Sequence, residues 1–398
     1  MQPPKTKNRI ESIDILRGIV MVIMALDHVR DFFHTTAWTD DPLNLETTTP
    51  ALFLTRWITH FCAPIFVFLS GTSIFLQGQR KSPNELFKFL IVRGLWLIFA
   101  EVIIITFAMT FNHRYSFVIL QVIWTIGISM VILAFLQKLP SRIILVIGLI
   151  IVLGHNLLDA AEAAPGFKAG FWWDLMHHSQ FAIYPISETR VLAILYPFVP
   201  WLGLMLLGYC FGIFFTSKYS IKERIGIFIK MGIGVLLFFV ALRASNLYGD
   251  PFHWAKQDSL IKTVLSFIKV NKYPPSLLYM SVTIGFAILV LPFLEKMKNG
   301  FTEIMRTFGR VAFFYYIIHW FILHSIILIY FYFKGHNYSF AVELSQNIPF
   351  MFVVPDDGLA LPYVYLIWAA LIFCLYPICK WYDQYKTSHP EKWWLSYL

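Results

Sequence analysis

The sequence predicts an all-α polytopic integral membrane protein with about ten transmembrane helices in one bundle. Hydrophobic residues make up 58% of the 398-residue chain and charged residues only 14%, whereas soluble proteins carry roughly 25% charged residues. Apolar stretches recur along almost the whole chain, each near the roughly 20 residues that a hydrocarbon core about 30 Å thick requires. Only short polar segments separate them, so residues 1–398 are expected to form a single domain.

Ten apolar segments are expected to cross the membrane, which puts both ends of the chain on one side. The first segment is expected to remain in the protein, because Asp14 and Arg17 interrupt it and no small-residue cleavage site follows. The expected spans are residues 11–33, 51–77, 88–110, 116–137, 142–159, 191–215, 226–245, 276–294, 309–333 and 360–381.

Lysine and arginine are concentrated in alternate gaps between these spans. Lys218, Lys222 and Arg224 follow the sixth span, and the gaps after the second, fourth and eighth spans are also basic. On the other side, residues 34–50 contain acidic residues and no lysine or arginine. Cytoplasmic loops of membrane proteins carry such an excess of positive charge. Both termini are therefore predicted to be cytoplasmic, and the net charge of +9 is assigned to membrane orientation rather than to nucleic-acid binding.

The cysteine pattern favours buried thiols over a disulfide framework or a zinc site. No C-x-x-C pair occurs, and each cysteine falls within an apolar segment. Metal binding through His177 and His178, or through the histidines of the first span, is the alternative. No tight H-x-x-x-H pair or carboxylate set supports it, so no metal site is expected. The four cysteines are Cys62, Cys210, Cys374 and Cys379.

The first span carries ionisable residues at depths where lipid disfavours charge. A charge at the bilayer centre costs at least about 2–3 kcal/mol, so each one requires a partner in the protein or in water. On a helix, Asp14, Arg17, His28 and Asp31 fall close to one face. Arg17 and His28 are separated by roughly 16 Å along the axis. Arg17 is thus expected near the cytoplasmic end and His28 near the outer end.

Residues at the outer end of this span form a candidate acid–base unit. Asp31 lies one helical turn from both Asp27 and His28, and His34 lies one turn beyond Asp31. A carboxylate there is positioned to orient an imidazole and to raise its basicity. The alternative is an ion pair at the start of the helix, with the outer residues solvated at the interface.

The second span brings further polar residues to the same depth. Arg56, His60 and Pro64 are one turn apart, and Pro64 frees the backbone carbonyl of His60. Two histidine-bearing helix ends are therefore expected to converge. Deeper in this span, residues 70–73 (Ser-Gly-Thr-Ser) are interpreted as a helix-packing motif, with hydrogen bonding to a ligand as the alternative.

Two later polar residues receive structural interpretations. Glu101, in the third span, has no obvious local partner. His319, in the ninth span, follows Tyr315 and Tyr316 on one helix face, so it can point into the bundle. A satisfied buried histidine is the preferred interpretation over a catalytic one.

At these residues the sequence resembles the bacterial relatives of heparan-α-glucosaminide N-acetyltransferase. The similarity rests on S-I-D-I-L-R-G-I at 12–19, L-D-H-V-R-D-F-F-H at 26–34, R-W-I-T-H-F-C-A-P-I-F-V-F at 56–68 and G-T-S-I-F-L at 71–76. Later segments around 197–209, 272–279 and 309–319 extend it over nearly the whole chain. Arg17 followed after ten residues by His28 also matches a motif of the broader transmembrane acyltransferases that modify envelope sugars.

The resemblance implies that acetyl-CoA binds from the cytoplasm and that its acyl group reaches a sugar amine or hydroxyl on the far side. It also implies a histidine base near the outer surface. His34, four residues before Trp38, is the nearest match to the family histidine; His28 falls where the eukaryotic enzyme has Asn, and His60 where it has an acidic residue. Phosphate groups bind well to charge-assisted hydrogen-bond donors. The candidates for holding the CoA phosphates are therefore Arg17, Arg80, Lys81 and Arg93. The usual excess of positive charge in cytoplasmic loops explains the last three equally well.

The expected function is that of a transmembrane acyltransferase that uses acetyl-CoA as acyl donor. His28 or His34 acts as base, Asp27 or Asp31 orients it, and His60 completes the site. The alternative is a proton-coupled transporter or flippase of a polar envelope solute, since membrane carboxylates and histidines serve pumps as well as enzymes. The expected partners are the lipid bilayer, acyl-CoA and an extracytoplasmic glycan or amino sugar, with no nucleic acid and with homo-oligomerisation left open. The expected location is the bacterial inner membrane.

Overall fold

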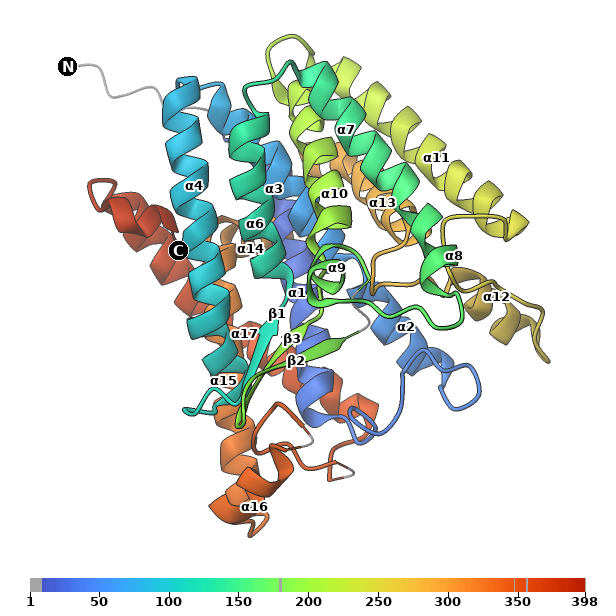
Figure 1. The fold of residues 1–398 in the computed structure, drawn as a ribbon. Coiled ribbons are helices and arrows are strands. Elements are labelled where there is room, and N and C mark those ends of the chain that lie inside the picture. Colours follow the sequence, from blue (N-terminus) through green and yellow to red (C-terminus); the bar gives the residue numbers. More distant parts are fainter. Residues whose placement is uncertain (1–8, 179–180, 347, 356, 398) are drawn as a thin grey trace.

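The computed structural model describes residues 9–178, 181–346, 348–355 and 357–397. Long helices form a bundle, and in Figure 1 the first helix begins near the top and ends near the bottom. The α-helices are α1 Glu11–Phe33, α2 Pro50–Thr59, α3 Cys62–Gly78, α4 Pro83–Phe99, α5 Thr106–Thr110, α6 Val122–Leu136, α7 Ser141–Gly154, α8 Asp159–Glu162, α9 Phe171–Met176, α10 Phe198–Phe211, α11 Ile221–Ser245, α12 Leu260–Ile268, α13 Leu277–Lys296, α14 Gly300–Arg310, α15 Ala312–Phe333, α16 Tyr338–Leu344 and α17 Leu361–Ser388.

The chain is an all-α polytopic membrane protein, as predicted. Eight described helical segments are long and apolar enough to cross a bilayer. They are Pro50–Gly78, Pro83–Thr110, Ser141–Glu162, Phe198–Phe215, Ile221–Ser245, Leu277–Lys296, Ala312–Phe333 and Leu361–Ser388. The other two predicted spans correspond to α1, which is 23 residues long but charged, and to α6, which is apolar but only 15 residues long.

Two predicted spans begin with a strand instead of a helix. Residues Phe117–Leu120 form β1, and Arg190–Ile194 form β3, so the helices that follow start later than predicted. β3 pairs in parallel with β1 and antiparallel with β2, Ala182–Ser187, which gives the order β1–β3–β2. This small sheet lies toward the end where α1 finishes (Figure 1). The strands are short runs rich in Val, Ile and Leu, and they satisfy their backbone groups by pairing with each other. A hydropathy pattern alone does not distinguish such an apolar strand from part of an apolar helix.

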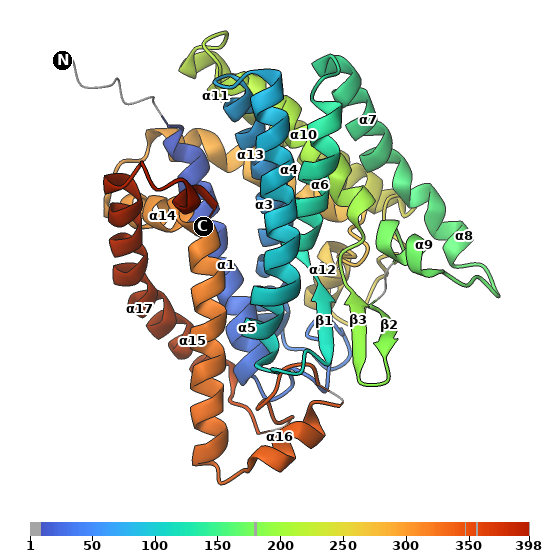
Figure 2. The same ribbon diagram turned by 60° about the vertical axis from the view of Figure 1, so that its left-hand side comes forward.

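Helix α1 lies inside the bundle because its neighbours approach it closely. It contacts α3, α13, α14, α15 and α17 (Figure 2). At the crossing of α1 with α14, a Cβ atom on Gly18 would overlap the carbonyl oxygen of Met305, and one on Gly309 would overlap that of Asp14. Glycine at both positions lets the two backbones touch. The crossing fixes the start of α1 against α14.

Glu101 is satisfied by the start of another helix, although the sequence showed no partner for it. It lies in a π-helical turn, Ala100–Ile105, that follows α4. Its two carboxylate oxygens accept hydrogen bonds from the backbone N–H groups of Gln121, at 3.2 Å, and Trp124, at 3.1 Å. These are free N–H groups at the N-terminus of α6, where a negative charge is also favoured by the helix dipole. Glu101 is therefore a structural residue.

The predicted burial of all four cysteines is partly wrong. Cys62 and Cys379 are buried, Cys210 is half-buried, and Cys374 is exposed on α17. An apolar span that faces lipid exposes its side chains to the bilayer, and burial inside the protein does not follow from apolar sequence alone. All four are free thiols. Within the described ranges, no three His, Cys, Asp or Glu side chains are grouped so that they could hold a metal ion.

Candidate active site

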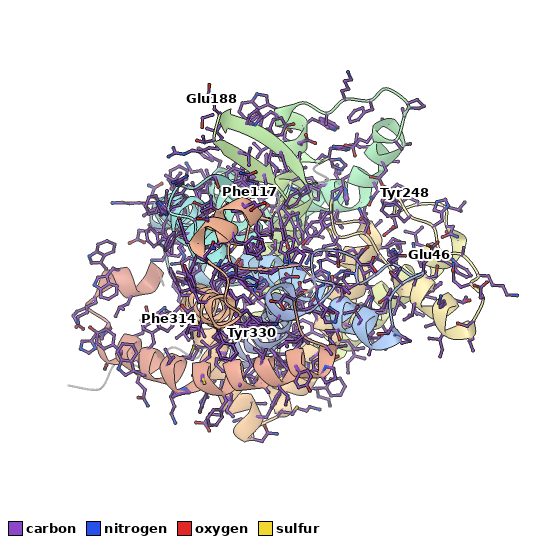
Figure 3. The ribbon with its side chains drawn as sticks, turned by 90° about the horizontal axis from the view of Figure 1, so that it is seen from below. Glu46, Phe117, Glu188, Tyr248, Phe314 and Tyr330 are labelled. Atoms are coloured by element: carbon purple, nitrogen blue, oxygen red, sulfur yellow. The ribbon has the colours of Figure 1, made fainter. Side chains whose placement is uncertain are left out.

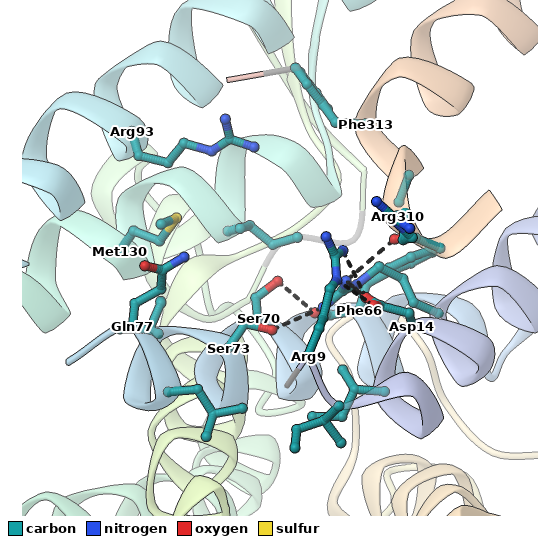
Figure 4. A pocket seen from close by; sticks show the side chains of 18 of the residues that line it. Arg9, Asp14, Phe66, Ser70, Ser73, Gln77, Arg93, Met130, Arg310 and Phe313 are labelled. Atoms are coloured by element: carbon teal, nitrogen blue, oxygen red, sulfur yellow. Dashed lines mark hydrogen bonds and ion pairs between the residues drawn. The ribbon is translucent and has the colours of Figure 1, made fainter. Parts of the chain in front are cut away.

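A cavity of about 660 Å³ lies at the end of the bundle where α1 begins. Figure 4 shows part of its lining from close by. It extends along α1 from Arg9 to Met24, and Tyr316 on α15 also lines it. Side chains of α3, α4 and α6 form further walls, and residues 215–217 and most of residues 309–313 also line it. Arg9, where the described chain begins, and Lys386, near the end of α17, line the same space, so these two segments lie at one end of the bundle.

The polar lining of the cavity is strongly basic. Asp14 is the acidic residue among the described lining residues, and it is outnumbered by arginine and lysine side chains (Figure 4). Lys81, one of the predicted CoA-binding residues, is not among the lining residues; its ammonium lies 5.4 Å from the centre of the Phe89 ring. The cationic lining residues are Arg9, Arg17, Arg80, Arg93, Arg310 and Lys386, so three of the four predicted residues are brought together.

Arg17 is held at the junction of three helices. Its guanidinium donates to the Asp14 carboxylate at 3.1 Å, to the backbone carbonyl of Gly309 at 3.3 Å, and to the Ser73 hydroxyl at 2.9 Å. Asp14 also accepts from Arg9 at 2.9 Å. The ion pair expected at the start of the first span is therefore present, and it belongs to the cavity wall.

The motif at residues 70–73 has two roles in the structure. Gly71 faces α10 so closely that a Cβ atom there would overlap the carbonyl oxygen of Met205, and the Thr72 hydroxyl donates to the carbonyl of Gly208 at 2.9 Å. These two residues pack helices, as predicted. Ser70 and Ser73 instead line the cavity. Packing alone therefore does not describe the motif.

His28 lies one helical turn beyond Met24, the deepest α1 residue that lines the cavity. Its Nδ1 atom is 2.6 Å from Nε2 of His319. The His28 ring stacks on Trp320, with ring centres 4.0 Å apart, and its centre lies 6.4 Å from that of the cavity-lining Tyr316. The half-buried imidazole is thus fixed directly behind the inner end of the cavity.

The acidic residues near His28 are bonded to arginine. Asp27 forms an ion pair with Arg30 at 3.1 Å and a second, short one with Arg56. Asp31 bonds to Arg30 at 2.5 Å. The hydrogen bonds described for these carboxylates differ from the predicted carboxylate–imidazole pair. Guanidinium groups give charge-assisted bonds that compensate a buried carboxylate more fully than a neutral imidazole does.

His60 lies at the break between α2 and α3, where it is only 2% exposed. Its backbone carbonyl, which Pro64 was expected to free, accepts a hydrogen bond from the Tyr279 hydroxyl at 2.8 Å. Its ring Nδ1 is buried and has no hydrogen-bond partner within the described residues. Charge from Arg56, Lys272 and Asp27 acts on this ring, so His60 shares the electrostatic environment of Asp27.

His34 lies outside this cluster, at the residue that follows α1. It is about 9 Å further along the axis than His28, given 1.5 Å per residue. Its Nδ1 atom accepts a hydrogen bond from the backbone N–H of Thr36 at 3.2 Å. Partial burial, together with the charge of Arg30, lowers the pKa of the His34 imidazole. The neutral ring is therefore favoured.

His319 and Trp320 are site residues that the sequence interpretation missed. His319 was expected to be a satisfied buried histidine, and it is buried, but its partner is His28. The sequence signals were its place on a polar face of an apolar helix and its position at the end of the 309–319 segment that shares the family resemblance. That face meets α1 through tertiary packing, which no local pattern specifies.

Residues 9–243 match the protein family described as heparan-alpha-glucosaminide N-acetyltransferase, catalytic. The match covers more than half of the chain and includes Arg17, His28 and most of the cavity wall, whereas His319 lies outside it. No curated protein gave a match. The chain belongs to the heparan-alpha-glucosaminide N-acetyltransferase family and is a transmembrane acetyltransferase.

Proposed function

We propose that this protein transfers an acetyl group from acetyl-CoA, bound in the basic cavity, to an amine or hydroxyl of an extracytoplasmic sugar, with His28 as the general base. The observation that carries the proposal is the closeness of the two parts of the site along α1. A cavity with a basic lining reaches along α1 to a point one turn short of a fixed, half-buried imidazole.

The lining of the cavity suits the two chemical parts of acetyl-CoA. Arginine and lysine side chains supply charge-assisted donors to phosphate oxygens, and several of them gather where the cavity begins. Further in, Met21, Met24, Ile126 and Met130 give an apolar wall. Such a wall suits the uncharged arm that carries the thioester. Lys81 is left out of the proposal because it does not line the cavity.

The other side of the site supplies the base. The nitrogen or oxygen of the acceptor attacks the thioester carbonyl, and its proton passes to Nε2 of His28. The carbon–sulfur bond then breaks, and the CoA thiolate takes up the proton. His60 completes the polar surroundings, while Asp27 and Asp31 hold Arg30 and Arg56 in place. His34 remains the alternative base, disfavoured by its distance from the cavity.

The proposed orientation places the basic end in the cytoplasm, where acetyl-CoA is made. The excess of lysine and arginine in the loops at this end supports it. The acceptor then approaches from the other side. The resemblance to bacterial relatives supports a bacterial inner membrane as the location in this proposal. The acceptor in this proposal is an envelope glycan or an amino sugar.

The experiment is to reconstitute the purified protein in vesicles and to measure free thiol from acetyl-CoA with and without glucosamine. The proposal expects CoA release that depends on glucosamine and acetylation of its amine. Replacing His28 by Ala should reduce turnover about 10²–10⁴-fold, as general-base assistance is worth that much. The exposed His113 is the matched control, and its replacement by Ala should leave turnover unchanged.

Two outcomes would contradict the proposal. Movement of glucosamine across the vesicle membrane without release of CoA would favour the transporter. Unchanged turnover after His28→Ala, in a protein that elutes and melts like the wild type, would remove His28 as the base.

A further inference from the structure

The His28–His319 contact continues to a backbone carbonyl. His319 is fully buried on α15, and its Nδ1 atom lies 3.2 Å from the backbone carbonyl oxygen of Tyr315, one turn earlier. Its Nε2 atom lies 2.6 Å from Nδ1 of His28. A chain of two hydrogen bonds therefore runs from the Tyr315 carbonyl through His319 to His28.

The end of this chain fixes the direction of both bonds. A carbonyl oxygen can only accept, so Nδ1 of His319 carries the hydrogen. In the neutral ring Nε2 of His319 then has a lone pair and accepts, so the hydrogen between the two rings belongs to Nδ1 of His28. The opposite direction would turn a lone pair of His319 toward the Tyr315 carbonyl, which is unfavourable in a buried site. Nε2 of a neutral His28 is thus the nitrogen with a free lone pair.

Packing keeps both rings in these positions. Trp320 stacks on His28 at 4.0 Å between ring centres, with an angle of 24° between the planes. The rings of Tyr315 and Tyr316 lie 5.7 Å and 5.5 Å from that of His319. Rotation of either imidazole would displace a buried aromatic ring, so the hydrogen-bond direction is maintained by the core of the bundle.

We propose that His319 is a positioning residue that holds His28 in the tautomer with Nδ1 protonated and Nε2 free to accept the acceptor's proton. The inference rests on the proposed role of His28 as base. When Nε2 takes the proton, Nδ1–H stays bonded to His319, so no proton has to leave through the protein. The same Nε2 then returns the proton to the CoA thiolate.

A neutral imidazole suits this role inside a membrane. In soluble enzymes a carboxylate commonly orients a catalytic histidine. Here the nearby carboxylates, Asp27 and Asp31, are bonded to arginine. A histidine bonded to a backbone carbonyl gives the same geometric control and adds no further buried charge to the bilayer interior.

The first test reads the tautomer of His28 directly in the unaltered chain. ¹⁵N NMR of the detergent-solubilised full chain, with labelled histidine, reports which ring nitrogen carries hydrogen. Comparison with His28→Ala identifies the His28 signals. The inference expects a protonated Nδ1 and an unprotonated Nε2 on His28 at neutral pH. The opposite tautomer, or an equal mixture of both, would overturn it.

The second test separates hydrogen bonding from packing. In His319→Leu the acceptor is lost, and kcat for glucosamine acetylation should fall at least about tenfold, with KM for acetyl-CoA unchanged. In His319→Gln the side-chain oxygen can replace Nε2 as acceptor, so most of kcat should return. His324→Leu is the matched control, because His324 is equally buried on the same helix and bonds to Met351 instead of His28.

The results distinguish this inference from the proposed function. If His28→Ala abolishes turnover but His319→Leu does not, His28 is the base and His319 does not position it. If His28→Ala retains turnover, the result contradicts both the role of His28 as base and the positioning role of His319. A loss of kcat that is equal in His319→Gln, His319→Leu and His324→Leu would show a packing role alone.

Discussion

The two ends of α1 carry similar residues but hold their charge differently. Near the start, Asp14 is shared by Arg9 and Arg17, and further cations line an open cavity. Near the end, Asp27 and Asp31 form ion pairs with Arg30 and Arg56 in a largely buried cluster. Positive charge beside open space suits an anionic ligand, whereas charges paired within the protein hold neighbouring groups in place. Under the proposed function, the first end binds the donor and the second positions the base.

Replacing Asp27 by Asn should give the largest effect on stability. It leaves Arg30 and Arg56 buried with a charge that is only partly compensated, which costs about 3–5 kcal/mol. Asp14→Asn should cost clearly less, because Arg9 is half exposed and Arg17 keeps Ser73 and the Gly309 carbonyl as partners. Thermal unfolding in detergent measures both, with the exposed Asp258→Asn as control. Equal losses from Asp27→Asn and Asp14→Asn would remove the contrast between the two ends.

Replacing Arg17 by Gln should weaken donor binding without slowing the chemical step. Loss of a charge-assisted hydrogen bond of about 1.5–3 kcal/mol corresponds to a rise in KM for acetyl-CoA of roughly 10- to 100-fold. The control is Lys81→Gln, since Lys81 belongs to a basic loop but not to the cavity lining. A fall in kcat at unchanged KM would assign Arg17 to the reaction step instead.

Salt should raise KM for acetyl-CoA by a few-fold and leave kcat unchanged. Raising ionic strength from about 0.1 M to 1 M shortens the Debye length from roughly 10 Å to 3 Å, which screens the exposed cations at the mouth of the cavity. Acetyl-pantetheine, which lacks the phosphates, is the matched donor. If its KM rises with salt as much as that of acetyl-CoA, phosphate recognition is not the cause.

His34→Gln should have the smallest effect, within about twofold on turnover. Burial lowers the pKa of His34 below its usual 6.5, so the unfolded chain binds this proton more tightly than the folded one. Its contribution to stability is therefore retained above pH 6.5 and lost as the pH falls through the lowered pKa. Melting curves from pH 7.5 to 5 should decline slightly less in His34→Gln than in wild type. A large loss of turnover would restore His34 as the candidate base.

Much of the fold was predictable because the thickness of the bilayer and the hydropathy of each segment together determine where a helix can span the membrane. The first predicted span, 11–33, has the bounds of α1, and each of the other predicted spans contains a helix. The strands were missed, since β1 and β3 are as apolar as the helices beside them. Their identity depends on pairing between segments some 70 residues apart in sequence.

The candidate site was predictable on each helix but not between helices. Periodicity on α1 selected Arg17 and His28, and both lie along the site. Arg93, on α4, lines the cavity, whereas Lys81, just before α4, does not. The sequence pattern alone did not separate these two residues. The partner of His28 lies 291 residues away in sequence. Only the crossing of α1 and α15 brings it there, and no local spacing encodes that crossing.

The capping of α6 by Glu101 has a consequence for how the protein enters the membrane. The first N–H groups of α6 are satisfied by a carboxylate from the α4 segment, and Gly94 and Gly127 let the backbones of the two helices approach closely where they face each other. A lone α6, 15 residues long, would place those N–H groups in hydrocarbon, and a lone third span would place an unpaired acid there. The two segments are therefore compatible with lipid only as a pair, so they should leave the translocation channel together as a helical hairpin.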